Sequence, residues 1–246
     1  MRTLHIIYIN LERNEERRTK FESMIETQQR LLEGKLQLHV HRFDAIDGYN
    51  KDTISNYVAN NDPRINPGEK GCLLSHIYAL RMAKSMNLDY CMICEDDVEL
   101  HIGELYDTFI DNFNKRPSNL TCWQLAVCTP NKESTHRLIN TRTAFFPYQF
   151  ACFCTSSYIM TKKGMNIILR KMMKDNKVHL LDSVGAINKA DHLLYSLNKT
   201  YTSSIPYAIS YPAQSNIHPH HSRMHRDNYE MFQKYLSILL ALQRRE

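Results

Sequence analysis

The first half of the chain alternates strand-like with helix-like patterns, and this alternation limits the possible folds more than any other feature. Short strand-like runs occupy 4–9, 38–43 and 90–94. Between them, 14–32 and 71–83 place apolar residues along one face of a helix. We therefore predict an α/β domain with a mostly parallel central sheet flanked by helices.

The second half extends this pattern less regularly. Two further helices and two strand-like stretches are expected at 102–114, 161–174, 122–128 and 143–160. The C-terminal residues carry apolar side chains in helical register, which is typical of an amphipathic helix. We expect a single domain over residues 1–226 and a C-terminal helix over 227–246 packed on it.

The composition narrows the classes of partner. The 246 residues are 43% hydrophobic and 23% charged, which suits one large folded domain. The net charge of +5 is spread over short basic pairs without a long basic block, so we expect no nucleic-acid partner. A mild positive charge is compatible with anionic ligands such as nucleotide phosphates. The basic pairs and the amphipathic C-terminus also allow a weak contact with a membrane surface.

The cysteines and the N-terminus bear on the cellular compartment. Seven cysteines without the dense spacing of a secreted scaffold favour reduced thiols. Cys91 and Cys94 are three apart in an expected strand, so they point to opposite faces and do not form a zinc pair. Cys152 and Cys154 share a face but lack a second pair at zinc spacing. The N-terminal sequence lacks the features of a signal peptide, so we expect a cytoplasmic protein.

The strand at 90–94 runs directly into three carboxylates, Glu95, Asp96 and Asp97. Two carboxylates ~4 Å apart repel by roughly 4 kcal/mol at an effective dielectric near ~20. In open α/β sheets the ligand site lies outside the carboxyl ends of the strands, and hard cations such as Mg²⁺ and Mn²⁺ take oxygen ligands there. The pattern therefore indicates either a cation that also binds a diphosphate or a solvated acidic turn.

Several stretches, in this order, resemble glycosyltransferase family 25, the group of lipooligosaccharide and collagen hydroxylysine galactosyltransferases. The resemblance covers about the first four-fifths of the chain. Its most specific parts are the Gly-Glu-x-Gly-Cys-x-x-Ser-His type string and the Glu-Asp-Asp after an apolar strand. The matching stretches are IYINLERNEERR at 7–18, RFDAIDG at 42–48, INPGEKGCLLSH at 65–76, YCMICEDDVEL at 90–100, SSYIMTKKG at 156–164 and KADHLL at 189–194.

The resemblance implies a GT-A type fold that uses a nucleotide-sugar donor and a divalent cation, Mn²⁺ or Mg²⁺. It implies a metal-dependent inverting glycosyltransferase that moves a hexose to a saccharide or hydroxylysine acceptor. UDP-galactose is the expected donor, although the bulky FACFCTSSY stretch at 150–158 leaves glucose and N-acetylglucosamine open. Two other classes compete: a non-catalytic nucleotide-sugar or glycan-binding module of the same fold, and another metal-dependent phosphate enzyme. The latter would need a second carboxylate cluster, and none is obvious in the sequence.

The acid block receives separate roles by similarity to an Asp-x-Asp signature. Glu95 and Asp97 are the outer members and alternate onto one face of an extended chain. We expect Asp97 to be the direct metal ligand and Glu95 to bind ribose or a metal-bound water. Asp96 is the member most suited to a structural role beside the nucleotide sugar.

The resemblance places the nucleotide pocket near the N-terminal stretch. Asn10, Leu11 and Arg17 are candidates to contact the nucleotide, with Arg17 as a planar donor fork for phosphate. The competing interpretation of Arg17 is a solvated helix residue. Asp47 is a candidate for uracil or ribose, or else a turn-forming residue before Gly48.

Ser75 and His76 are expected near the donor sugar or phosphate. His76 also shares the apolar stripe of its helix, so it equally fits a buried histidine whose hydrogen bonds are satisfied within the protein.

Asp191 is the candidate general base, because an inverting transfer needs a carboxylate that accepts the proton of the acceptor hydroxyl. Its alternative role is a helix N-cap. Asp182 is the second candidate base.

The stretch QSNIHPHHSRMH at 214–225 concentrates four histidines, at 218, 220, 221 and 225. Pro219 makes it a loop in every interpretation. His221 is a candidate metal ligand; alternatively, the loop is a flap with His221 or Ser222 near the diphosphate, or a polar loop with no ligand.

Overall fold

The computed structural model describes residues 2–60, 63–149, 151–181, 189–212 and 222–244. Its centre is a sheet of seven strands in the order β2-β1-β3-β7-β5-β10-β6. The strands are β1 (Thr3–Asn10), β2 (Gln37–Asp44), β3 (Tyr90–Glu95), β5 (Cys122–Gln124), β6 (Phe146–Pro147), β7 (Ser157–Thr161) and β10 (Thr200–Thr202). β7 and β6 run antiparallel to their neighbours and the other pairings are parallel. The predicted α/β class with a mostly parallel central sheet is confirmed.

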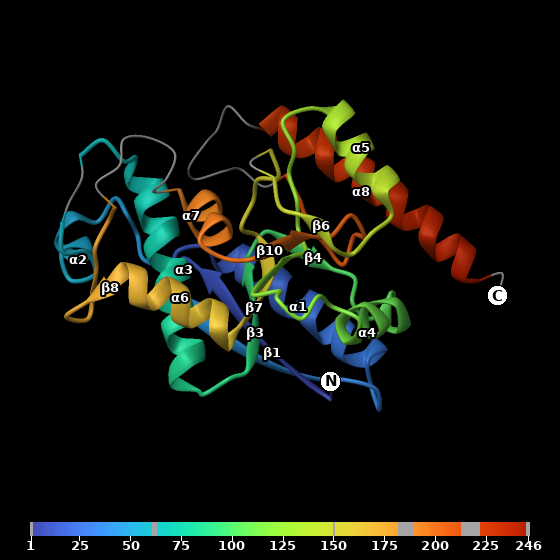
Figure 1. The fold of residues 1–246 in the computed structure, drawn as a ribbon, viewed down its shortest axis with the longest axis horizontal. Helices are drawn as coiled ribbons and strands as arrows, with labels where there is room; N and C mark the ends of the chain where they lie inside the picture. The colour runs from blue at the N-terminus through green and yellow to red at the C-terminus, as the bar shows by residue number, and fades with distance from the viewer. Residues whose placement is uncertain (1, 61–62, 150, 182–188, 213–221, 245–246) are drawn as a thin grey trace.

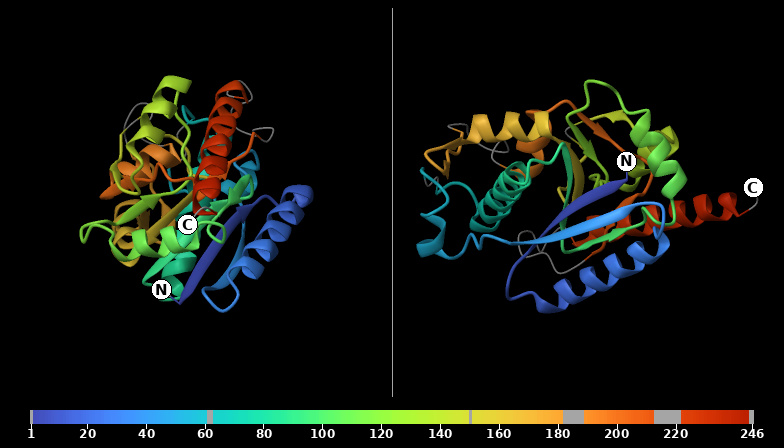
Figure 2. Two further views of the ribbon diagram at one scale, coloured as in Figure 1. Left: turned by 90° about the vertical axis from the view of Figure 1, so that its right-hand side faces the viewer. Right: turned by 90° about the horizontal axis from the view of Figure 1, so that it is seen from below.

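Helices cover both faces of this sheet (Figures 1 and 2). One core contains buried side chains of α1, α4, α5 and α8, and the other contains those of α3, α6 and α7. The helices are α1 (Glu15–Leu31), α2 (Lys51–Ile54), α3 (Pro67–Ser85), α4 (Tyr106–Asn114), α5 (Lys132–Thr141), α6 (Lys162–Met172), α7 (Ala190–Ser196) and α8 (Ser222–Gln243). Two small antiparallel pairs complete the fold: β4 (Val98–Leu100) with β11 (Ala208–Ser210), and β8 (Met173–Lys174) with β9 (Lys177–Val178).

Strand alternation divides the apolar residues between the two cores. On β3, Met92 and Cys94 face one core, while Cys91 and Ile93 face the other. This two-sided burial explains why the strand is apolar throughout, as strands covered on both faces are. It also separates the thiols of Cys91 and Cys94, as the spacing predicts.

Several predicted boundaries move for local reasons. α3 begins at Pro67 instead of residue 71, because Asn66 Oδ1 accepts a hydrogen bond from Gly68 N–H at 2.8 Å and proline suits the first helical position. β5 ends at Gln124 instead of 128, because the next two backbone N–H groups both donate to Ser157 O. The strands expected over 143–160 are β6 and β7, which pair with other strands of the sheet and not with each other.

The C-terminal helix begins at Ser222, earlier than the predicted 227. Its first turns are held by the buried Asn228, whose side chain accepts from Thr129 N–H at 2.9 Å and donates to Thr129 O at 2.9 Å. Phe232 and Leu236 are buried against the domain. Within the described ranges, no helix is both long enough and apolar enough to cross a membrane.

The carboxyl ends of β1, β2 and β3 meet at one edge of the sheet. The register aligns Asn10 with Asp44, and Ile9 with Glu95. The acid block therefore lies beside the end of β1 and the start of α1. This edge is where the fold class places ligands.

Candidate active site

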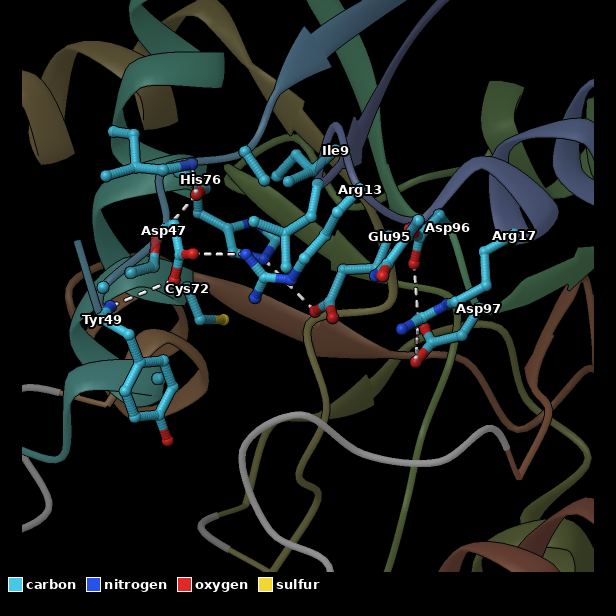
Figure 3. Close-up of a pocket in the computed structure, with 18 residues that line it drawn as sticks. Ile9, Arg13, Arg17, Asp47, Tyr49, Cys72, His76, Glu95, Asp96 and Asp97 are labelled. Atoms are coloured by element: carbon cyan, nitrogen blue, oxygen red, sulfur yellow. Dashed lines mark hydrogen bonds and ion pairs between the residues drawn. The ribbon is translucent and has the colours of Figure 1, made fainter. Parts of the chain in front are cut away.

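The acid block is held by a charged partner from α1. Arg17 Nη2 lies 2.5 Å from Asp96 Oδ1 and 2.8 Å from Asp97 Oδ2 (Figure 3). Asn10 Nδ2 donates to Asp96 Oδ2 at 2.7 Å. One guanidinium thus bridges two adjacent carboxylates and offsets part of their repulsion.

Glu95 is held by a separate set of partners. Its Oε1 accepts a hydrogen bond from Thr155 Oγ1 at 2.7 Å and lies 3.3 Å from His76 Nε2. The other ring nitrogen of His76 is 3.1 Å from the hydroxyl of Tyr158. Burial alone would raise the pKa of Glu95, but its hydrogen bond and charge interaction with His76 lower the pKa below the ordinary value.

Asp97 contacts Arg17 through only one of its two carboxylate oxygens, Oδ2. Burial, followed by the charge of Glu95, raises the pKa of Asp97 to about 7 even though Arg17 opposes the shift. Among the described residues, nothing donates a hydrogen bond to its buried Oδ1. Carboxylate oxygens are the ligands that Mn²⁺ and Mg²⁺ prefer. The donor set of Asp97 and Glu95 therefore fits a hard divalent cation.

A pocket opens on one side of the acid block, and we call it the Asp47 pocket. Leu11, Arg13, Asp47 and Tyr49 line it together with Arg17, Ser75, His76 and the three acidic residues. Arg13 forms an ion pair with Asp47. Asp47 Oδ1 also accepts from Tyr49 N–H at 3.1 Å, so this residue both forms a turn and lines the pocket.

Two of the predicted site residues, Asn10 and Ser75, are buried and form hydrogen bonds within the protein. Asn10 is 1% exposed, and it donates to Asn14 O and Asp96 and accepts from Arg42 Nε. Ser75 Oγ donates to Gly71 O and accepts from the N–H of Ile46, which ties the 45–49 loop to α3. Ser75 also lines the Asp47 pocket, whereas Asn10 holds Asp96, one of the lining residues.

A second pocket lies on the other side of the acid block, and we call it the Asp191 pocket. It is lined by Phe153, Cys154, Asp191, His192, Tyr211 and His225, among others, and it shares Cys72, Glu95 and Asp97 with the Asp47 pocket. The acid block and KADHLL are far apart in the sequence, and the fold makes them two sides of one site.

Asp191 lies in the first turn of α7, and Lys189 occupies the N-cap position. The N-cap alternative for Asp191 is therefore wrong. Asp191 Oδ1 accepts from His192 N–H at 2.8 Å, and Oδ2 lies 3.4 Å from Cys154 N. Cys154 has a left-handed φ of 89°, and its carbonyl accepts from Tyr195 OH at 2.7 Å. These bonds fix the carboxylate against the 153–155 segment.

The structure adds site residues that the sequence did not indicate. Thr155, Tyr158 and Tyr211 each contact the acid block or its histidine; Tyr211 OH donates to Asp96 O at 3.1 Å. Their sequence separations from the partners range from 60 to 115 residues. Thr155 and Tyr158 lie within the FACFCTSSY stretch noted in the sequence, but only the fold shows what they contact, and no local pattern marks Tyr211. Arg13 could have been noted within the LERNEERR stretch. The candidates Asp182 and His221 lie outside the described residues.

A mixed sheet whose edge carries buried carboxylates between two pockets defines an α/β protein with a ligand site at the strand ends. The family follows from the sequence: residues 3–183 match glycosyltransferase family 25 (LPS biosynthesis protein), so the chain belongs to this family. No curated protein matches the chain.

Solved structures give remote similarities. One is a glycosyltransferase involved in the glycosylation of the major capsid of PBCV-1, with 7% identity, a TM-score of 0.39, and coverage of 67% of this chain and 62% of that chain. Mouse xyloside xylosyltransferase 1 in its apo form has 10% identity and a TM-score of 0.33, and the match covers 67% of this chain and 69% of that chain. A third is a Bacillus anthracis protein classed provisionally as a glucose-1-phosphate thymidylyltransferase, in complex with a sucrose. It has 7% identity and a TM-score of 0.36, and the match covers 82% of this chain and 86% of that chain. The family assignment therefore rests on the sequence match.

Proposed function

We propose that this protein is a metal-dependent inverting glycosyltransferase of the GT-A type that moves a hexose from a UDP-sugar, with galactose as the first candidate, to a saccharide or hydroxylysine acceptor. The observation that carries the proposal is the pair of pockets that share Glu95 and Asp97. A transfer between two substrates needs two binding sites that meet at the reacting bond.

The nucleotide of the donor is assigned to the Asp47 pocket. Arg13, Asp47 and Tyr49 offer a cation, a carboxylate and an aromatic ring at the end of the pocket away from Asp97 (Figure 3). These groups suit a base and a ribose, which present hydroxyls and a flat ring. The diphosphate would then lie toward Glu95 and Asp97, beside Arg17.

Asp97 and Glu95 would hold the cation. When bound, Mn²⁺ or Mg²⁺ would supply positive charge for the diphosphate and for the leaving nucleoside diphosphate. Asp97 is favoured as a ligand because its Oδ1 is buried and, among the described residues, receives no hydrogen bond. Arg17 would keep the neighbouring Asp96 paired and oriented.

Asp191 is assigned the proton transfer. It lines the pocket opposite the nucleotide side, and its carboxylate is oriented by backbone N–H groups. The acceptor hydroxyl would bind in the Asp191 pocket and give its proton to this carboxylate as its oxygen attacks the sugar carbon. Attack from the face opposite the diphosphate inverts the configuration at that carbon.

The first experiment is hydrolysis of a panel of UDP-sugars with Mn²⁺ and with chelator, by the wild type and by Asp97→Ala. We expect slow hydrolysis of one donor, and we expect both the chelator and the substitution to abolish it. Calorimetry of UDP binding provides the parallel readout. UDP binding without turnover of any donor would instead favour a non-catalytic nucleotide-sugar-binding module. Absence of both binding and hydrolysis would contradict the proposal.

A further inference from the structure

Three side chains with different donor atoms converge where the two pockets meet. The sulfur of Cys72, a ring nitrogen of His76 and a carboxylate oxygen of Glu95 all lie within 4.8 Å of one another. Cys72 and His76 are four residues apart on α3, which places them on one helix face. Glu95 ends β3 and faces them (Figure 3).

We propose that Cys72, His76 and Glu95 form a Zn²⁺ site that shares only Glu95 with the cation site proposed at Asp97. Thiolate, imidazole and carboxylate are the ligands that zinc takes in proteins. Mn²⁺ and Mg²⁺ favour sites made of oxygen. A thiol and an imidazole therefore select a softer metal than the one expected for a diphosphate.

The spacing of the donor atoms suits a tetrahedral ion. Zinc–ligand bonds of about 2.0–2.3 Å place neighbouring ligand atoms about 3.3–3.6 Å apart. The separation of His76 Nε2 from Glu95 Oε1 is 3.3 Å. The sulfur of Cys72 is within 4.8 Å of both atoms, so it lies at the third corner of the same donor cluster.

The supporting hydrogen bonds of a metal site are already formed. Metal-binding histidines commonly use their second nitrogen in a hydrogen bond that fixes the ring. Here His76 Nδ1 lies 3.1 Å from the buried hydroxyl of Tyr158, which leaves Nε2 directed at Glu95. Thr155 holds the Glu95 carboxylate at 2.7 Å. Zn²⁺ at Nε2 would replace the hydrogen bond between His76 and Glu95 and would leave the contacts with Tyr158 and Thr155 in place.

Among the described residues, the site has three protein ligands. Cys72 and Glu95 line both pockets, so a fourth ligand can be water or a bound substrate group. Glu95 belongs to both donor sets, so zinc at Cys72 would withdraw it from the site at Asp97. If the proposed function holds, Zn²⁺ inhibits the transfer that Mn²⁺ supports.

The test uses the 246-residue chain, free of metal and without nucleotide. Zn²⁺ binding is measured by calorimetry, and Co²⁺ serves as a spectroscopic probe because thiolate ligation produces a ligand-to-metal charge-transfer band. We expect Cys72→Ser to weaken Zn²⁺ binding by at least about tenfold and to remove the band. Cys154→Ser, at a second thiol of the Asp191 pocket, is the matched control and should leave both unchanged. A band that persists in Cys72→Ser, or one that disappears in Cys154→Ser, would overturn the assignment.

A wild-type measurement removes the dependence on variant folding. Alkylation of Cys72, followed by mass spectrometry, should slow at least about tenfold with Zn²⁺ and be unaffected by Mg²⁺. Equal rates with and without Zn²⁺ would contradict the site. Asp97→Asn separates the two metal proposals, because it should keep the cobalt band while losing Mn²⁺-dependent UDP binding. Loss of the band in Asp97→Asn would mean that the two donor sets are one site.

Discussion

Arg17 allows two adjacent carboxylates, Asp96 and Asp97, to lie close together. It bridges Asp96 and Asp97 at 2.5 and 2.8 Å, and its side chain is 21% exposed. Burial alone would lower the pKa of Arg17, but the charges of Asp97 and Asp96 raise it above the ordinary value. Its contribution is therefore to hold the site together as much as to contact a ligand.

Replacement of Arg17 by Met would leave two carboxylates without their cationic partner. We expect the free energy of unfolding to fall by about 3 kcal/mol in metal-free buffer. Without the guanidinium, the desolvation of the remaining carboxylates is no longer offset by an opposite charge. Urea unfolding measures this change. Arg30→Met, at an exposed position of the same helix, should change stability by less than about 0.5 kcal/mol. Equal stability of Arg17→Met and wild type would show that the pair is dispensable.

Asp191 is predicted to act in turnover and not in donor binding. Asp191→Asn keeps one oxygen, which can retain the shorter bond from His192 N–H, while the longer bond from Cys154 N–H to the second oxygen is lost. We expect the transfer rate to fall by about 10²- to 10⁴-fold, with UDP affinity within about twofold. Rate assays and calorimetry measure the two quantities. Asp89→Asn, at an exposed site, is the control. An unchanged rate in Asp191→Asn would transfer the role of base to another carboxylate, with Asp182 next to be tested.

At the scale of elements, the Asp47 pocket depends on close contact between the 45–49 loop and α3. A Cβ atom on Gly48 would lie 1.7 Å from Pro67 O, and one on Gly71 would lie 2.5 Å from Ile46 O. Glycine is therefore required on both sides of this contact. The contact sets how near Asp47 and Tyr49 come to the acid block.

Gly71→Ala should separate the loop from the helix. We expect a loss of about 1–3 kcal/mol in unfolding free energy and at least about fivefold weaker UDP binding, because the pocket wall moves. Thermal unfolding and calorimetry measure these effects. Gly34→Ala is the control, because the φ of Gly34 is 72° and no atom lies within 4 Å of the added Cβ. Its left-handed backbone should lower the free energy of unfolding by about 1–2 kcal/mol, and UDP affinity should not change. Unaltered UDP affinity in Gly71→Ala would contradict this account of the pocket.

A second element-scale contact holds α7 in place. Tyr195 OH donates to Cys154 O at 2.7 Å, which joins the helix of Asp191 to the segment that bonds its carboxylate. Tyr195→Phe should lower stability by about 1–2 kcal/mol and reduce turnover more than UDP affinity. Tyr201→Phe removes the exposed bond to Asn119 and is the control. An equal effect of Tyr195→Phe on turnover and affinity would argue against a positioning role.

At the scale of the whole molecule, the site joins segments that are distant along the chain. The acid block follows β3, Arg17 belongs to α1, Thr155 precedes β7 and Asp191 lies in α7. A ligand that binds between them stabilises the native state as one unit. This coupling predicts a metal-dependent stabilisation.

UDP together with Mn²⁺ should raise the unfolding midpoint more than the sum of their separate effects. At a ligand concentration of 100 times Kd, the gain in unfolding free energy is about 2.7 kcal/mol. Calorimetric melts with UDP, Mn²⁺, both, and both plus chelator measure the effect. Asp97→Asn should lose the synergy. Additive shifts in the wild type would mean that metal and nucleotide bind independently.

Local sequence patterns predicted the α/β class and the main elements on either side of the acid block. Hydrophobic periodicity identifies β1, β3 and α3 because both faces of these strands, and one stripe of the helix, are buried. Periodicity did not predict where β5 ends. The strand ends at Gln124 because the N–H groups of Leu125 and Ala126 both donate to Ser157 O. The start of α8 also depended on a distant partner, Thr129, for Asn228.

The sequence alone determined the short-range features. These are the strand that ends in Glu95, Asp96 and Asp97 and the carboxylate ligands that these residues supply at its end. The tertiary structure decided which groups meet. The pairing of Arg17 with two of the acids, of Thr155 and His76 with Glu95, and of Asp191 with Cys154 joins residues from different elements. Periodicity reports which face of an element is buried, whereas such contacts depend on how the strands are ordered in the sheet and how the loops cross its edge.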